Sequence, residues 1–271
     1  MLRLPLIALA FLPALAGAEC RFSADRNFDV AAAGLGTVAF DLGSSDVVVE
    51  GAPGLATVEV RGRACASDAS MLDRLTVDES RSGDRLLVTP HDVGGNAWHG
   101  HYAYIELHVR VPSKLAIDIK GESGDAEARN VARVDFDTSS GDLDASHVSG
   151  MLNVHVSSGD VRGQDIGSVD VARTGSGDIV LRDVHGPTEV GRSGSGDLSF
   201  DNVGSVRIGG VGSGDVRVSD ASGDVVVDSI GSGDVSVDGV DGNFHVGSRG
   251  SGDIHHRNVR GTVSVPRDDD D

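Results

Sequence analysis

The feature that most constrains this chain is a Ser-Gly-Asp triplet that returns at nearly constant spacing through its second half. The positions of the triplet aspartates differ by 17 to 19 residues from one copy to the next. One additional triplet, ending at Asp224, falls about halfway through a period. A fixed period of this length is typical of repeat architectures. The phased aspartates are Asp125, Asp142, Asp160, Asp178, Asp197, Asp215, Asp234 and Asp253.

Aligning the repeats on these aspartates places residues of one kind at the same position. The residue after each aspartate is apolar, as at Leu198 and Val216, and several copies have a second apolar residue two positions further on, as at Phe200. The fifth residue after the aspartate is usually a turn former such as Asn202, and an aliphatic residue follows it. Short alternating stretches separated by Gly, Asn and Asp predict two or three very short strands in each repeat.

This repeat predicts an all-β fold. A unit of 17–19 residues cannot bury its own apolar face, so neighbouring units must stack on it. One repeat per coil, each coil pairing edge to edge with the next, gives a parallel β-solenoid. At about 4.8 Å between strands, some eight coils would make a rod about 40 Å long. The aromatic content of 4% suits a narrow interior filled by small aliphatic side chains.

Changes in this pattern divide the chain into segments. Residues 1–18 have one charge, then an apolar run and small residues before a cleavage site, which predicts a signal peptide. Residues 19–120 are expected to form an irregular strand-rich section continuous with the solenoid, because Ser44 to Val60 reproduces the repeat columns. Residues 121–266 form the regular solenoid, and residues 267–271 an acidic tail. We therefore expect an exported protein that is periplasmic, surface-bound or secreted.

The two cysteines, Cys20 and Cys65, both follow the predicted signal peptide. Because an exported chain enters an oxidising compartment, we expect a disulfide between them. No segment after the signal peptide is apolar enough to span a bilayer, so we do not expect an integral membrane protein.

The charge of the chain limits the classes of partner. Lys and Arg number 23 against 42 Asp and Glu, for a net charge of −19. Nucleic acids and anionic membrane surfaces are recognised by clustered cations, so this balance argues against both.

The order of these segments resembles a known bacterial family. The junction "HVRVPSKLAIDIKGESGD", the stacked "SSGD" and "GSGD" coils and the closing "GTVSVP" are similar to the "putative adhesin" family of unknown function. The resemblance covers most of the mature chain, and the junction and the phased triplets are its most specific parts. It implies a β-solenoid fold and an extracytoplasmic or surface role. The family carries no agreed catalytic residues, so the resemblance transfers none.

Two roles are open for the triplet aspartates. In a structural role, each carboxylate would accept hydrogen bonds from the backbone amides of its own turn, which would offset the repulsion between stacked carboxylates. A calcium role is the alternative, because two calcium-binding nonapeptides have the same period. The motif differs, and one carboxylate per coil supplies few of the six to eight oxygens that calcium needs. Only Asp215, Asp224 and Asp234 have nonapeptide spacing and are candidate calcium ligands; no other cofactor is expected.

The sequence offers little for an enzyme. Coils of near-constant length leave little chain for a cleft, and no pair of carboxylates or nucleophile with a base is singled out. His99 and His101 could present two imidazoles to zinc or copper, but a solvated hairpin tip is the favoured interpretation.

We therefore expect a non-enzymatic solenoid that acts as an adhesin or as an envelope binding or structural protein. Its partner would be an envelope or surface protein or a glycan, which the sequence does not name. A calcium-binding β-roll-like module is the alternative, and a carbohydrate-active β-helix is a more remote one.

Overall fold

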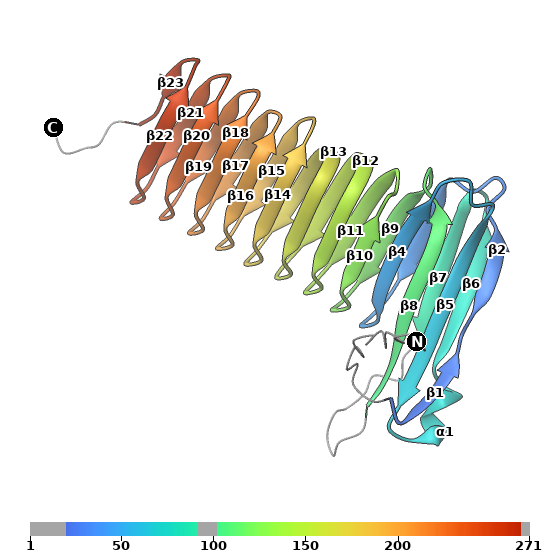
Figure 1. Ribbon diagram of the computed structural model, residues 1–271. Helices are drawn as coiled ribbons and strands as arrows, with labels where there is room; N and C mark the ends of the chain where they lie inside the picture. The colour runs from blue at the N-terminus through green and yellow to red at the C-terminus, as the bar shows by residue number, and fades with distance from the viewer. Residues whose placement is uncertain (1–19, 92–101, 267–271) are drawn as a thin grey trace, which may run out of the picture.

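The computed structural model describes residues 20–91 and 102–266, and almost all of this range is β-structure. Its 23 strands form one continuous hydrogen-bonded network, with a single short helix, α1 (Ala69–Leu72), in the described range. Figure 1 shows a rod of stacked coils joined to a wider block at the N-terminal end. The predicted all-β parallel β-solenoid is confirmed. Outside the described residues lie the predicted signal peptide (1–18), the predicted acidic tail (267–271) and His99 and His101.

Each coil of the rod contributes to two parallel ladders (Figure 1). The strand after each triplet aspartate pairs with its counterpart in the next coil, and so does the strand that follows it. The first ladder contains β10 (Ala126–Arg129), β14 (Ile179–Val184), β16 (Leu198–Val203), β18 (Val216–Ala221), β20 (Val235–Val240) and β22 (Ile254–Val259). The second contains β11 (Arg133–Thr138), β15 (Thr188–Ser193), β17 (Val206–Val211), β19 (Val225–Ile230), β21 (Phe244–Arg249) and β23 (Val263–Ser264). The longer strands β12 (Leu143–Val156) and β13 (Val161–Thr174) run through both ladders.

The burial pattern of the rod strands explains the columns in the sequence. In β16, Leu198, Phe200 and Val203 are buried, so positions one, three and six face the core while positions four and five both face outward. In the first ladder the fifth residue has a positive φ, which favours Asn, Asp and Gly. Except for Asn130, which follows the end of β10, these residues bend a continuous strand rather than end it, which the sequence pattern did not indicate. They are Asn130, His147, Asp165, Asp183, Asn202, Asp220, Gly239 and Asn258.

The solenoid begins within the N-terminal section. β4 (Asp46–Ala52) pairs in parallel with β10, and β9 (Ala116–Gly121) pairs in parallel with β11. β8 (Ala103–Pro112) lies parallel to β4, and β3 (Thr37–Asp41) lies parallel to β9. Both ladders of the rod therefore continue into this section without a break.

Antiparallel strands make this end of the molecule wider than the rod (Figure 1). β5 (Thr57–Ala66) pairs antiparallel with β8, and it carries β1 (Phe22–Asp25) and β2 (Phe28–Ala31) on its other edge. On the second ladder β7 (Arg85–His91) lies parallel to β3, and β6 (Thr76–Ser82) pairs antiparallel with β7. These strands extend both ladders beyond the first parallel coils.

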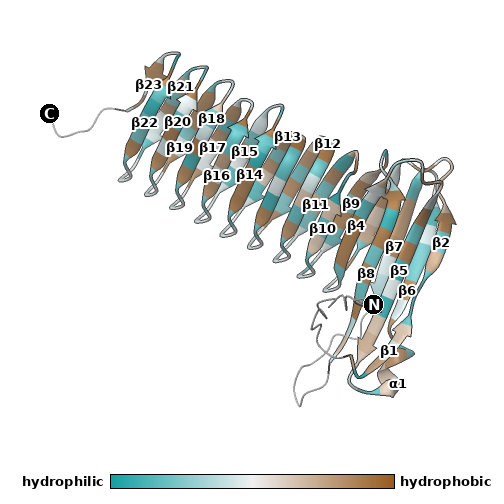
Figure 2. Ribbon diagram, in the orientation of Figure 1, coloured by the Kyte–Doolittle hydropathy of each residue, from teal (hydrophilic) through white to brown (hydrophobic). Residues whose placement is uncertain are grey.

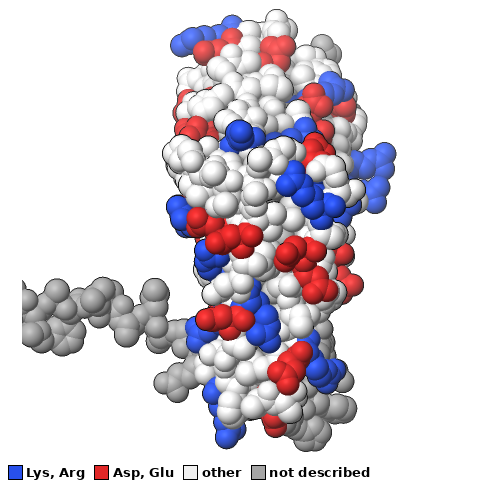
Figure 3. All heavy atoms as spheres, turned by 90° about the vertical axis from the view of Figure 1, so that its right-hand side faces the viewer, with Lys and Arg blue, Asp and Glu red and all other residues white. Residues whose placement is uncertain are grey.

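Apolar side chains fill the interior along the whole length of the rod. Figure 2 shows apolar and polar bands alternating across the strands. The core is mostly aliphatic, and it includes four phenylalanines that are at most 2% exposed: Phe40, Phe136, Phe200 and Phe244. Seen from the N-terminal block, Figure 3 shows positive and negative side chains interspersed over the surface.

Candidate functional site

The glycine of each phased triplet lies where two coils approach closely. A Cβ atom at Gly196 would stand 2.0 Å from the carbonyl oxygen of Gly177, and one at Gly214 would stand 2.0 Å from that of Gly196. Real Cβ atoms do not approach an oxygen this closely, so only glycine fits between stacked coils. Ser45 holds the same place at the start of the column, and Gly124 stacks on its carbonyl oxygen.

The triplet aspartates form a continuous ladder along one edge of the rod. The Oδ1 atom of each aspartate accepts a hydrogen bond from the backbone amide of the aspartate one coil later, at 2.8 to 2.9 Å. Asp46 begins the ladder by accepting from the amide of Asp125 at 2.9 Å. The sequence predicted acceptance from the amides of the same turn, whereas the donor stands in the next coil. The carboxylates therefore join coils to one another.

Buried hydroxyl groups close several of these turns from the inside. Thr174 Oγ1 donates to the carbonyl oxygen of Gly177 at 3.2 Å, and Ser193 Oγ donates to that of Gly196 at 3.1 Å. Both side chains face the core in the second ladder, at the place that Val211 and Ile230 hold in later coils. Sequence reasoning missed these residues, although a Thr or Ser three residues before the triplet glycine is a visible signal.

Asp224 does not belong to the main ladder. It precedes β19 in the second ladder, whereas Asp215 and Asp234 precede β18 and β20 in the first. Its Oδ1 atom accepts from the amide of Asn243 at 2.7 Å, and Asn243 Oδ1 accepts in turn from the amide of Thr262 at 2.9 Å. The second triplet thus starts a short ladder at the opposite turn.

The structure does not bring the three candidate calcium ligands together. A six-residue strand separates Asp215 from Asp224, and another separates Asp224 from Asp234. At about 3.3 Å per residue, such a strand is far longer than a calcium coordination sphere. Within the described residues there is no group of three or more His, Cys, Asp or Glu side chains arranged to hold a metal ion.

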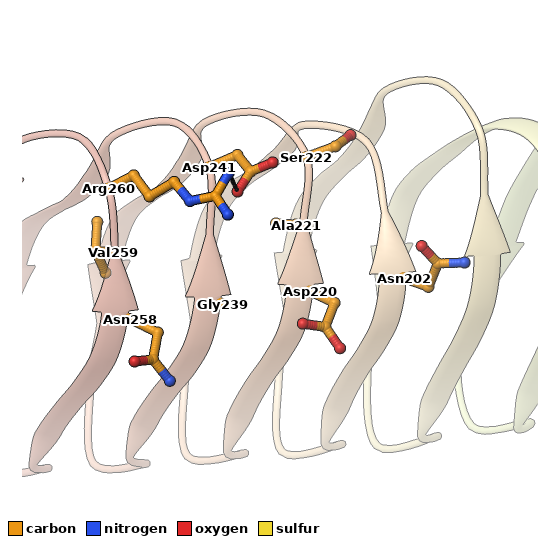
Figure 4. Close-up of a pocket in the computed structure, with 9 residues that line it drawn as sticks. All are labelled: Asn202, Asp220, Ala221, Ser222, Gly239, Asp241, Asn258, Val259 and Arg260. Atoms are coloured by element: carbon orange, nitrogen blue, oxygen red, sulfur yellow. Dashed lines mark ion pairs between the residues drawn. The ribbon is translucent and has the colours of Figure 1, made fainter.

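A hollow of about 610 Å³ lies beside the bend of the first ladder near the C-terminal end (Figure 4). It opens where Gly239 takes the bend position that Asp220 and Asn258 hold in the adjacent coils. Figure 4 shows the ion pair between Asp241 and Arg260, 2.9 Å long, at the edge of this hollow.

A second hollow, of about 490 Å³, lies on the outer face of the second ladder, where β9, β11, β12 and β13 run side by side. Asp135, which lines it, accepts hydrogen bonds from the Arg133 guanidinium, at 2.8 and 2.9 Å, and from the side-chain amide of Asn153. Burial disfavours the ionised form of Asp135, but these hydrogen bonds outweigh burial and hold the pKa of its carboxyl below the usual value. The exposed thioether side chain of Met151 lines the same hollow.

Comparison with known families agrees with this architecture. The family model described as Toastrack DUF4097 matches residues 41–208, well over half of the chain. The chain belongs to this family. The resemblance drawn from the junction and the triplets is thereby confirmed, and the match spans the opening section of this Toastrack protein as well as its first regular coils.

Solved structures that are similar to this chain come from several bacteria. A protein of Parabacteroides distasonis ATCC 8503, described as a "putative lipid binding protein", is 13% identical with a TM-score of 0.50, covering 86% of this chain and 96% of that one. A "putative adhesin" of Bacteroides fragilis NCTC 9343 is 13% identical with a TM-score of 0.39, covering 91% and 98%. A "putative cell adhesion protein" of Clostridium sporogenes ATCC 15579 is 11% identical with a TM-score of 0.33, covering 87% and 99%. No curated protein matches the chain.

The predicted disulfide of this Toastrack protein is present. Cys20 and Cys65 are bonded, with their Cα atoms 5.5 Å apart, so the first described residue is tied to β5. Cys65 is buried, which places the bond against the core of the N-terminal block. The described part of the chain has no helix with the length and apolar character needed to cross a bilayer.

Proposed function

We propose that this Toastrack protein is an exported, non-enzymatic β-solenoid that binds a partner in the cell envelope or at the cell surface, as an adhesin or an envelope structural protein. The partner is a surface protein or a glycan that contacts the outer faces of the two ladders.

The observation that carries this proposal is that some positions of each coil serve stacking and the core, while others face outward and vary. The glycine and the aspartate of the triplet serve coil stacking, and positions one, three and six fill the core in strands such as β16. What differs from coil to coil is the outward position two residues after each aspartate. That column reads Glu127, Asp144, Arg162, Val180, Ser199, Arg217, Ser236 and His255. A rigid rod with an irregular outer face suits recognition of one particular partner.

The proposal also takes account of how related structures are described. Two of the similar solved structures are described as a "putative cell adhesion protein" and a "putative adhesin". An adhesive role would suit an elongated rod whose two ladders both have outward-facing positions. The triplet carboxylates are held in the backbone ladder, where each Oδ1 atom accepts an amide of the next coil.

The test is capture of partners from envelope fractions by the full-length protein, compared with two outer-face variants. Arg217→Glu lies on the first ladder and Arg192→Glu on the second, so a partner lost with one variant and kept with the other reports the binding face. Fractionation of the native host checks export. Retention in the cytoplasm, or no captured component together with unchanged attachment of a deletion strain, would contradict the proposal.

A further inference from the structure

One column on the outer face of the second ladder carries basic residues in consecutive coils. His155, Arg173 and Arg192 are register neighbours on β12, β13 and β15, and Gly210 of β17 follows them. All three basic side chains are exposed. Adjacent coils are about 4.8 Å apart, so the two guanidinium groups rise side by side from the same face.

The two arginines differ from most other arginines of the rod. Arg207, Arg257 and Arg260 each pair with an aspartate of a neighbouring coil, at 2.7 to 2.9 Å. Neither Arg173 nor Arg192 forms an ion pair with any described residue. Like charges directly opposite each other destabilise a sheet. In a chain with 42 carboxylates and a net charge of −19, an unneutralised pair of stacked arginines indicates that the countercharge comes from elsewhere.

The surroundings leave room for such a countercharge. Gly210 has no side chain beside Arg192, and Ala172, next to Arg173, lines the hollow of about 490 Å³ on this face. His155 lines the same hollow and faces Asp137 at 3.4 Å, so this end of the column already has an acidic neighbour. The open positions are therefore at Arg173 and Arg192.

We propose that Arg173 and Arg192 together bind one oxoanion, a phosphoryl or carboxylate group, carried by an anionic glycan. Each guanidinium presents a planar fork of N–H donors that fits two oxygens of such a group. The proposed site specifies the chemical class of the partner, and it therefore rests on the proposed binding function.

The neighbouring charges favour a glycan over an anionic bilayer. Asp170 and Glu189, themselves register neighbours, stand on the same strands three residues before the arginines and face outward on the same side. A flat anionic surface would meet these two carboxylates at the same time as the arginines, and the negative field of the whole rod would repel it. A single narrow chain can contact the arginine pair alone.

The test compares the full-length protein with two double variants of equal charge. Arg173→Gln with Arg192→Gln removes the proposed site, and Arg207→Gln with Arg257→Gln removes two arginines that have intramolecular partners. The probes are polygalacturonate, for a carboxylated glycan, inorganic phosphate as a competitor, and vesicles containing phosphatidylglycerol. Calorimetry gives the affinities, and circular dichroism confirms that each variant is folded.

We expect wild-type protein to bind polygalacturonate at low salt, inorganic phosphate to compete, and the Arg173/Arg192 variant to bind about tenfold or more weakly. The Arg207/Arg257 variant should stay within about twofold of wild type. Equal weakening in both variants, no binding of the anionic glycan, or binding to vesicles alone would overturn the proposal. If the Arg173/Arg192 variant still captures an envelope partner, the arginine site is rejected while the proposed function stands.

Discussion

The Oδ1 atom of Asp197 accepts a hydrogen bond of 2.8 Å from the backbone amide of Asp215, the residue in the same place one coil later. The amide of Leu198 donates at 2.8 Å to the carbonyl oxygen of the same Asp215. Side chain and backbone of consecutive triplets therefore interlock at the turn. The same pair of contacts joins Asp142 with Asp160 and Asp215 with Asp234. The stability of the rod should depend on residue type at these positions more than at any outward position.

The triplet glycine should not tolerate a side chain. In Gly196→Ala the new Cβ would lie 2.0 Å from the carbonyl oxygen of Gly177, so the coils would have to separate. We expect a loss of about 3 kcal/mol in the free energy of unfolding by urea, the upper part of the range for overpacking. Gly210→Ala is the matched control, because its Cβ would meet only the movable Ser229 hydroxyl at 3.0 Å. Similar losses in both variants would show that the close approach of coils is not the cause.

One buried hydroxyl should destabilise the protein as it stands. Thr188 is fully buried with no hydrogen-bond partner for Oγ1, and Val169 and Val206 hold the same place in the adjacent coils. Thr188→Val keeps the shape and removes the unsatisfied group, so we expect a gain of about 1 kcal/mol in urea unfolding.

The reverse result is expected at Thr174, which provides the control for that substitution. Its hydroxyl donates to the carbonyl oxygen of Gly177, so Thr174→Val should cost about 1 kcal/mol. If the two substitutions changed stability in the same direction, hydrogen bonding of the hydroxyl would not explain the difference.

Acid should weaken the fold partly through Asp135. The Arg133 and Asn153 hydrogen bonds, acting against burial, hold the pKa of this carboxyl below its unfolded value of about 3.9. The ionised group therefore stabilises the folded state above the unfolded pKa, and this contribution is lost as the pH falls through the lower folded pKa.

We expect the urea midpoint of Asp135→Asn to fall less than that of wild type when the pH is lowered from about 5 to about 2. Arg133→Gln should move the titration of Asp135, followed by carboxyl carbon NMR, to higher pH because its strongest hydrogen-bond donor is gone. Identical pH profiles for wild type and Asp135→Asn would show that this carboxyl does not contribute to the loss of stability in acid.

Calcium should leave the stability of the protein unchanged. Asp224 stands at the turn opposite to Asp215 and Asp234, and the Oδ1 atoms of Asp215 and Asp224 already accept backbone amides. Thermal unfolding with millimolar calcium and with a chelator should therefore give the same midpoint. A rise of several degrees with calcium that is lost in Asp224→Ala would show that a cation binds at this turn.

The repeat columns made the fold predictable, because apolar residues such as Leu198 and Val216 return at the same position in every coil. Contacts between coils were harder to predict. A column shows which residue types stack, but the direction of the hydrogen bond from Asp215 to Asp197 depends on the stagger of one coil over the next. The positive φ of His147 was likewise hidden, since the bend is imposed by its neighbours in the stack rather than by histidine itself. The lack of an ion pair at Arg173 and Arg192 also could not be predicted from the sequence, because carboxylates lie close to each arginine along the chain.

The most direct test of the central claim, that the triplet aspartates join coils, replaces Asp178, Asp197 and Asp215 together and measures urea unfolding with a chelator present. Asparagine keeps an acceptor oxygen, and Asn243 already accepts the amide of Thr262 in this way. We predict a triple asparagine variant close to wild type and a triple alanine variant about 3 kcal/mol less stable, since each lost hydrogen bond contributes about 1 kcal/mol. Equal stability of the alanine and asparagine variants would contradict the claim, because the carboxylate oxygens would then contribute nothing to coil stacking.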